Sequence, residues 1–202
     1  MILRRLTLSA LAVVALTLPA HAHHMMDGGL PNTFAQGLLS GLGHPIIGLD
    51  HLSFIVAVGV AVGAYGLNAA VALAFVGASM LGVLAHVAGV SVPGAEILVA
   101  ASVLLVGVLL ARGTALPALG WSALFAVAGL LHGYAYGESI YGAEQSPLLA
   151  YLAGLFVIQS VIALGVAALT RQIVASPLNA RLGGAAVAGI GLAVLAGHIL
   201  PA

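Results

Sequence analysis

The chain has 202 residues, of which 62% are hydrophobic, while only five are acidic and five are basic. A soluble domain carries about a quarter charged residues, so this composition excludes a soluble fold and predicts that the main solvent is lipid. The formal net charge is zero and there is no cysteine, which excludes a basic nucleic-acid surface, disulfides, iron–sulfur clusters and thiolate metal sites. All five cations are arginines, so lysine-based covalent chemistry is excluded as well.

The N-terminal segment has the three parts of a secretory signal. Two arginines precede an apolar run over residues 6–18, and residues 20–22 form a small-x-small cleavage sequence. We predict that residues 1–22 are a cleaved signal peptide and that residues 23–202 form a single transmembrane helical domain. The alternative is an uncleaved first helix, although the run is short for a span of about 20 residues.

Cleavage would leave a mature chain that begins with His23 and His24, followed by Met25 and Met26. A free amine beside two imidazoles is a candidate chelate for Ni²⁺ or Cu²⁺, and the two thioethers favour copper. The alternative is a disordered polar terminus, and the sequence does not decide between the two.

Six apolar runs follow, separated by residues typical of turns. They predict spans at residues 50–66, 68–90, 94–111, 115–136, 147–170 and 183–200. The expected fold class is all-α, a polytopic membrane bundle of about six transmembrane helices after the signal peptide. A count of five stays open because the break near Gly66 is short. Ahead of these runs, residues 34–42 are apolar but too short to span, which predicts a re-entrant or interfacial half-helix.

A signal peptide places the mature N-terminus outside, and the arginines agree with that orientation. Arg112, Arg171 and Arg181 then fall at cytoplasmic ends, as the positive-inside rule requires. The other ionisable groups of the spans fall at the opposite ends: Asp50, His51, His86, Glu96, His132, Glu138 and His198. Polar groups at membrane depth are costly and usually functional, so this placement predicts a cation-capture site at the periplasmic mouth.

His44, Asp50 and His51 lie within eight residues. In a continuous helix the two histidines would be roughly 10 Å apart, too far to share a metal whose nitrogen ligands lie about 2 Å from it. Pro45 and Gly48 can break the helix, and broken helices in membranes line cavities and build ion sites. The alternative is a helix start capped by Asp50, with both histidines at the lipid headgroup level.

A second pattern, LHGYAYGE, occupies residues 131–138 and contains His132 and Glu138. Glycines recur at four-residue spacing in the same helix at Gly129, Gly133 and Gly137. Such a stripe lets another helix approach closely, which would hold His132 and Glu138 toward that neighbour. The alternative is that the glycines mediate packing alone and His132 bonds a neighbouring backbone group.

Three further side chains have less support. Glu96 is either a ligand or a first-turn acid favoured by the helix dipole. His86 and His198 are isolated histidines, for which a structural or interfacial role is the commoner one. Imidazole and carboxylate without thiolate suit Ni²⁺, Co²⁺, Zn²⁺ or Cu²⁺ better than Mg²⁺ or Ca²⁺.

The patterns HxxxxxDH from His44 and HGxAxGxE from His132 resemble the two signatures of the HupE/UreJ family. These are bacterial inner-membrane proteins associated with hydrogenase and urease gene clusters. The resemblance extends over the whole chain and implies a secondary permease for nickel, with cobalt as an alternative. Copper is a further alternative because of Met25 and Met26. The metal is then a substrate and no fixed cofactor is expected. The metal-handling residues that the resemblance implies are His44, Asp50, His51, His132 and Glu138. Glu96, His86, His23 and His24 form a second group of candidates, which the sequence pattern alone suggests.

The same resemblance implies an inner-membrane location with a periplasmic mature N-terminus. The implied partners are the metal ion, the lipid bilayer and the hydrogenase or urease systems that use the metal, without nucleic acid; no oligomeric state is indicated. Three positions depart from the family pattern. Leu131 replaces a Phe, Tyr136 replaces the second His of the motif, and Gln159 stands in a span that often carries a histidine.

Two other functions share these residues. An intramembrane zinc hydrolase also gathers histidines and an aspartate, and it keeps an open position for water. A membrane metal sensor or assembly partner would bind the ion without moving it. No nucleotide-binding motif is present, so a permease would carry no energy-coupling domain of its own.

Overall fold

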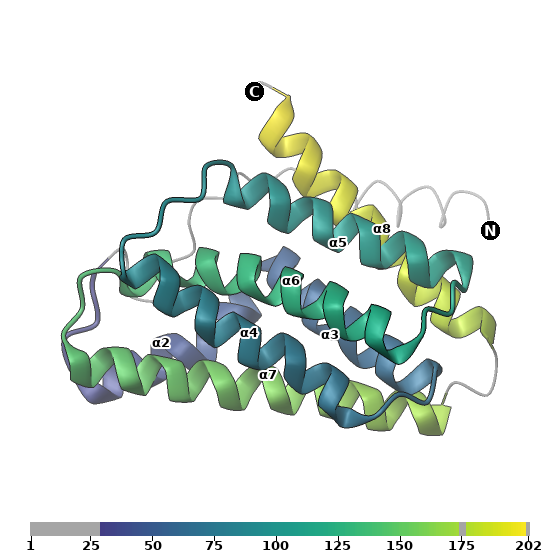
Figure 1. Ribbon diagram of the computed structural model, residues 1–202, viewed down its shortest axis with the longest axis horizontal. Coiled ribbons are helices and arrows are strands. Elements are labelled where there is room, and N and C mark those ends of the chain that lie inside the picture. The colour runs from purple at the N-terminus through teal and green to yellow at the C-terminus, as the bar shows by residue number, and fades with distance from the viewer. Residues whose placement is uncertain (1–28, 174–176, 201–202) are drawn as a thin grey trace, which may run out of the picture.

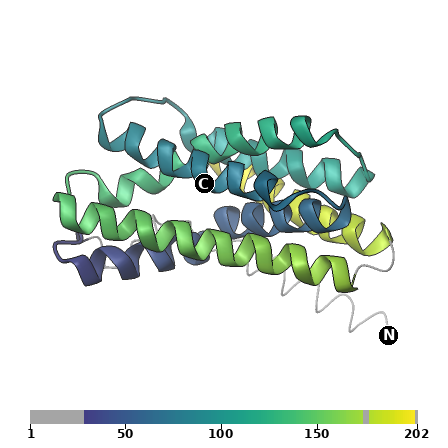
Figure 2. The same cartoon turned by 60° about the horizontal axis from the view of Figure 1, so that its bottom comes forward.

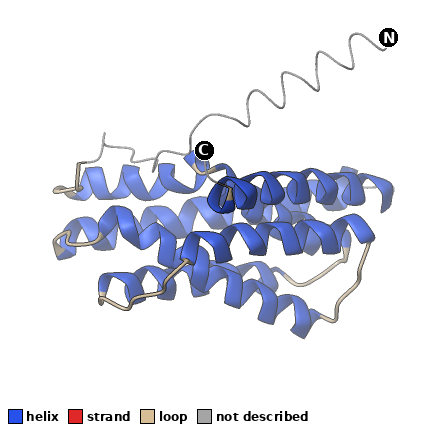
Figure 3. Ribbon diagram, turned by 90° about the horizontal axis from the view of Figure 1, so that it is seen from above, coloured by secondary structure: helices blue, strands red, loops and turns tan. Residues whose placement is uncertain are grey.

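The computed structural model describes residues 29–173 and 177–200, and within these ranges it consists of helices and connecting loops (Figure 3). The elements are α2 (Phe34–Ile47), α3 (Leu49–Ala64), α4 (Ala69–Val87), α5 (Ala95–Arg112), α6 (Ala118–Gly137), the short 3₁₀ helix η1 (Glu138–Ile140), α7 (Gln145–Ile173) and α8 (Pro177–Ile199). The predicted signal peptide, with His23 and His24, lies outside the described residues.

The expected all-α membrane bundle is confirmed. In the described part of the chain, five helices are long and apolar enough to cross a membrane, and α2 with α3 forms a sixth if this bent pair is one span. The choice between five and six spans therefore depends on that pair. The predicted bounds agree to within a few residues except for α8, which begins at Pro177 rather than at residue 183. Proline is well suited to the first position of a helix because its φ angle is already helical.

The pair α2 and α3 meets at a bend of 79°. Gly48 is extended at the break (ψ 112°), and its N–H donates to the His44 carbonyl at 3.3 Å. The prediction that the helical segment ends at residue 42 is wrong, because α2 continues through Pro45 to Ile47 and only Gly48 interrupts it. Pro45 removes a single backbone donor in the last turn, which a helix end tolerates.

The spans pack in three groups (Figures 1 and 2). In the first, α2 and then α3 run along α7 in the same direction, so that the broken pair follows one long helix. Gly37 and Gly41 of α2 contact Pro147 and Tyr151, and further along α7 the Cβ positions of two α3 glycines would meet Ala163 and Ala167. In the second group α4 and α6 are parallel, and in the third α5 and α8 are antiparallel.

The glycine stripe of α6 confirms the predicted close helix contact, and the neighbour is α4. A Cβ atom on Gly129 would lie 2.5 Å from the Phe75 carbonyl oxygen, and one on Gly133 would overlap the Ser79 backbone. Because no side chain separates the two backbones, α6 is held at a fixed depth and rotation against α4.

The hydrophobic interior is divided into two clusters. The larger one includes Phe54, Phe75, Phe125 and Trp121, and the smaller one comprises Val83, Tyr136, Ile140, Tyr151 and Leu155. A polar layer lies between them: the His132 ring contacts Phe54 on one side (4.4 Å between centroids), and the His51 ring contacts Tyr136 on the other (4.4 Å).

The two ends of the bundle carry opposite charges. At one end Arg171 donates to the Leu67 carbonyl at 2.6 Å and Arg181 to the Ala111 carbonyl at 2.9 Å, beside Arg112. We call this the arginine end. The opposite, acidic end carries Glu96, Glu138 and Glu144. The predicted gathering of the described arginines at one end is thus confirmed, while the side of the membrane that each end faces stays a prediction.

Candidate metal centre

The bend after α2 brings together three histidines that the sequence separates. The ring centroids of His44 and His51 are 5.9 Å apart, and those of His51 and His132 are 5.1 Å apart. The two facing nitrogens, Nδ1 of His51 and Nδ1 of His132, are 2.9 Å apart. His132 is 0% exposed and His51 is 7% exposed. Together with Asp50 these side chains form what we call the histidine layer.

A serine holds the His132 ring in one orientation. Nε2 of His132 lies 3.0 Å from the Ser102 hydroxyl, which itself donates to the Val99 carbonyl at 2.7 Å. Since the hydroxyl has only one proton, it accepts from Nε2–H, and the lone pair of His132 is on Nδ1. His51 then donates to that atom from its own Nδ1. A partner of this kind fixes the tautomer of metal-ligating histidines in general.

Two hydroxyl groups orient the His44 ring through hydrogen bonds, as Ser102 does for His132. Its Nδ1 is 2.9 Å from the Ser139 hydroxyl and 2.9 Å from the Tyr151 hydroxyl. Both hydroxyls donate to the Tyr136 carbonyl, at 3.1 Å and 2.9 Å. The carbonyl can only accept, so Nδ1 of His44 carries the proton and its Nε2 carries the lone pair that a metal would use.

Asp50 lies in the first turn of α3, where its Oδ1 accepts the His51 backbone N–H at 2.8 Å. It therefore satisfies a backbone donor near the helix start, but the interpretation of Asp50 as the helix cap is wrong, because the N-cap residue is Gly48 and no side chain caps this helix. That interpretation also placed both histidines at the lipid headgroup level, which stays a prediction; within the bundle, the His51 side chain is buried. Gly48 is needed at this turn, since a Cβ atom there would lie 2.7 Å from Cδ2 of His51.

Tyr136 forms one wall of the layer. Its ring lies 5.1 Å from that of His44 and 4.4 Å from that of His51, between centroids. The side chain is 0% exposed, and its hydroxyl is one of four buried side-chain groups that lack a hydrogen-bond partner in the described structure. A buried hydroxyl left unpaired costs about 1–3 kcal/mol. A buried hydroxyl beside the layer is therefore available to form a further hydrogen bond.

The separation of the two facing nitrogens has a chemical consequence. Two nitrogen ligands of one ion, each about 2.0–2.1 Å from it and at a right angle, lie about 2.9 Å apart. Nδ1 of His51 and Nδ1 of His132 have this separation already. An ion could take the place of their hydrogen bond once the proton of His51 moves to Nε2 and both rings turn their lone pairs toward the ion. Within the described residues, however, no three histidine or carboxylate side chains converge closely enough to hold one ion.

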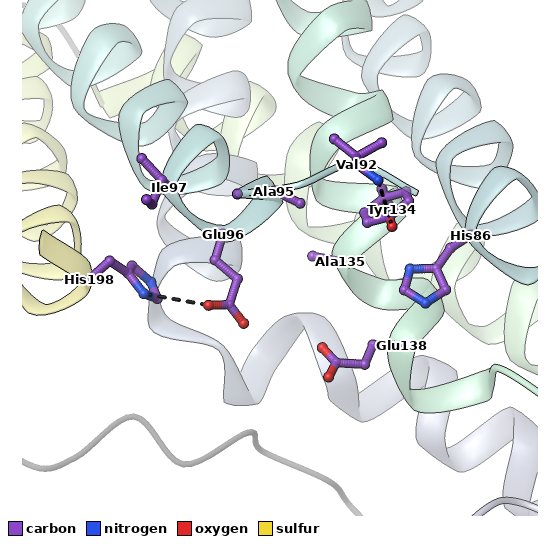
Figure 4. Close-up of a pocket in the computed structure, with 10 residues that line it drawn as sticks. His86, Val92, Ala95, Glu96, Ile97, Tyr134, Ala135, Glu138 and His198 are labelled. Carbon is purple, nitrogen blue, oxygen red and sulfur yellow. Dashed lines mark hydrogen bonds and ion pairs between the residues drawn. The ribbon is translucent and has the colours of Figure 1, made fainter. Parts of the chain in front are cut away.

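The remaining candidates lie elsewhere. Glu138 is exposed, and it lines a pocket of about 340 Å³ at the acidic end together with His86, Glu96 and His198 (Figure 4). Glu138 follows His132 by six residues, which is about 240° around a helix of 3.6 residues per turn, so the two side chains face different directions. We call it the acidic pocket.

Sequence reasoning missed three residues that hydrogen-bond to the histidine layer: Ser102, Ser139 and Tyr151. Ser102 is an isolated polar residue in an apolar helix, and that isolation could have marked it. Ser139 and Tyr151 contact His44 because α2 packs along α7 and η1 lies beside them, so the local sequence gave no signal for these two residues.

Comparison with known proteins shows which family the chain belongs to. The family model described as "HupE / UreJ protein" matches residues 11–194. The chain belongs to this family. It is 34% identical to Protein HupE of Rhizobium leguminosarum bv. viciae over 194 residues, which cover 94% of this chain and 96% of that protein. No solved structure matches.

The resemblance to the HupE/UreJ family that the two motifs suggested is thus confirmed. The departures from its pattern lie in different surroundings. Tyr136 replaces a histidine within the histidine layer itself. Gln159 is 0% exposed and donates to the Ser79 hydroxyl at 3.1 Å and to the Leu155 carbonyl at 3.3 Å. In this HupE/UreJ protein, Gln159 therefore joins α7 to α4.

Proposed function

We propose that this HupE/UreJ protein imports a divalent transition-metal ion across the bacterial inner membrane, with nickel as the first candidate and cobalt or copper as alternatives. The ion is the transported substrate, and no fixed cofactor is required. The acidic end, with the mature N-terminus, faces the periplasm, and the arginine end faces the cytoplasm. Metallation of hydrogenase or urease is the proposed use of the imported ion.

The observation that carries the proposal is the histidine layer. Three imidazoles and a carboxylate lie side by side within an apolar bundle, at the break of a span that borders α7. Ionisable groups within membrane bundles are rare because their burial is costly, and they mark ion pathways. Neutral imidazole with carboxylate is a ligand set suited to nickel, cobalt and copper.

The proposed roles follow from the contacts. His132, anchored by Ser102, and His51 bind the ion through their facing nitrogens. His44 adds Nε2 only after its ring moves, because the three rings do not converge on one point in this arrangement. Asp50 supplies negative charge that offsets the charge of the ion. Phe54 and Phe75 close the layer toward the arginine end, so onward passage requires a rearrangement of the helices.

Uptake of radiolabelled Ni²⁺ by whole cells tests this proposal, with Co²⁺ and Cu²⁺ as competitors. We expect cells with the natural chain to accumulate nickel, and Asp50→Ala and His132→Ala to abolish accumulation at normal membrane levels. Ser160→Ala is the matched control, because the hydroxyl of Ser160 is buried in α7 without a partner. The most effective competitor identifies the preferred metal.

Absence of accumulation with the natural chain would contradict transport. If the purified protein still binds the ion, a sensor or assembly role replaces the permease. If it instead hydrolyses lipid amides in a zinc-dependent manner, the hydrolase hypothesis replaces it.

A further inference from the structure

We propose that the acidic pocket is a second cation site, separate from the histidine layer, which collects a partly hydrated divalent transition-metal ion before the ion enters the bundle. The inference rests on the proposed function for its direction of flow. The binding site itself is argued from the side chains of the pocket. They come from four elements: His86 from α4, Glu96 from α5, Glu138 from η1 and His198 from α8.

The pocket contains the donor types that such an ion prefers. Glu96 and His198 face each other, with Oε2 of the glutamate 3.5 Å from Nδ1 of the histidine, and Glu138 points into the same opening (Figure 4). Nδ1 of His86 is buried and has no hydrogen-bond partner in the described structure. Two carboxylates and two imidazoles together match nickel, cobalt or copper better than calcium or magnesium.

The size of the pocket suits an ion that keeps its water. A water molecule occupies about 30 Å³ in the liquid, so six waters around an ion need about 180 Å³. The pocket has a volume of about 340 Å³. In the described residues no three histidine or carboxylate side chains converge as ligands around one point, so side chains would bind partly through coordinated water. Such binding is weak and fast, as capture requires.

The charge of the surroundings favours entry at this end. Glu96, Glu138 and Glu144 lie at the acidic end, while Arg112, Arg171 and Arg181 lie at the opposite end of the bundle. Negative charge in a cleft with apolar walls raises the local concentration of cations and their rate of arrival. Among the residues that the structure describes, the pocket therefore has no arginine beside it to cancel the two carboxylates.

A short connection joins the pocket to the histidine layer. Glu138, in the pocket, is followed directly by Ser139, whose hydroxyl lies 2.9 Å from Nδ1 of His44. Both belong to η1, so an ion that draws Glu138 toward it also acts on the residue that orients His44. The two sites thus share one element, although their ligand side chains differ.

Equilibrium dialysis of the purified protein with ⁶³Ni²⁺ alone tests the site without requiring transport. We expect the natural chain to show a tight and a weak class of binding. The double variant Glu96→Gln, His198→Gln should lose the weak class and keep the tight one, while Asp50→Asn, His132→Gln should do the reverse. Glu96→Gln alone serves as a second variant, because the Glu96 side chain is 69% exposed and its replacement leaves the packing intact.

Glu144→Gln is the matched control, since it removes the same charge at the same end but lies outside the pocket. In cells, Glu96→Gln should raise the KM for uptake about tenfold, at the low end of the effect of electrostatic steering, and leave the maximal rate unchanged. A single class of binding in the natural chain, or equal losses in Glu144→Gln and Glu96→Gln, would overturn the second site. Two classes of binding without any uptake would overturn transport and leave the site standing.

Discussion

At the scale of single residues, the chemistry of the histidine layer depends on hydroxyl groups as much as on histidines. Each anchored imidazole has one nitrogen committed to a serine or tyrosine, and this determines which nitrogen carries the lone pair. The sequence pointed to His44, His51 and His132, because histidine is rare in apolar segments. It did not indicate which nitrogen of each ring is available, since that depends on residues from other helices.

Ser102→Ala should weaken metal binding without unfolding the protein. Loss of the hydroxyl frees His132 to adopt the other tautomer and to rotate, and loss of a partner of this kind typically lowers metal affinity about 10- to 100-fold. Equilibrium dialysis of the purified variant measures the effect. Ser160→Ala, whose hydroxyl has no partner in the described structure, should bind as the natural chain does. Equal affinity in both variants would show that Ser102 does not orient the site.

At the scale of helices, glycine positions determine which spans can touch. The stripe of α6 was readable from four-residue spacing, and it does meet a neighbouring helix. The sequence could not name α4 as that neighbour, because small residues also occur in every other span. The broken pair α2 and α3 likewise could be predicted only in part. Proline and glycine predicted a break, but only the structure assigns it to Gly48 and places both helices along α7.

Gly133→Ala should destabilise the bundle, because its Cβ would overlap the backbone of Ser79 and force α4 and α6 apart. Overpacking of this kind costs about 1–3 kcal/mol. Gly77→Ala in α4 is the matched control, since no atom lies within 4 Å of the added Cβ and alanine favours helix. Thermal unfolding in detergent should give a lower Tm for Gly133→Ala and an equal or higher Tm for Gly77→Ala. An unchanged Tm in Gly133→Ala would contradict close packing of α4 and α6.

At the scale of the whole molecule, the bundle is polarised. At one end, arginine side chains donate hydrogen bonds to backbone carbonyls. At the other end, two carboxylates are among the groups that line a pocket. The alternation of span directions inferred from the sequence is consistent with this arrangement, because α4 and α6 are parallel while α5 and α8 are antiparallel. The positive-inside rule predicts the orientation in the membrane, which the fold does not give.

Cysteine labelling tests the orientation, and the absence of native cysteine leaves no background. Ser91→Cys, in the loop between α4 and α5, should react with a membrane-impermeant maleimide added to intact spheroplasts. Ala115→Cys, beside the arginine end, should react only after permeabilisation. Both positions are exposed in the structure. The opposite pattern would invert the membrane orientation and with it the proposed direction of capture.

The sequence by itself determined that the chain lies mainly in lipid, that its fold is all-α, roughly where its spans begin and end, and that its ionisable groups are few. These properties depend on local composition and on the fixed thickness of the bilayer. The sequence also supplied the two motifs of the HupE/UreJ family. Only the tertiary structure decided that the predicted ligands divide between a buried histidine layer and an exposed pocket that contains Glu96 and Glu138. That division depends on how helices distant in the sequence rotate against one another, and glycine contacts between backbones set those rotations.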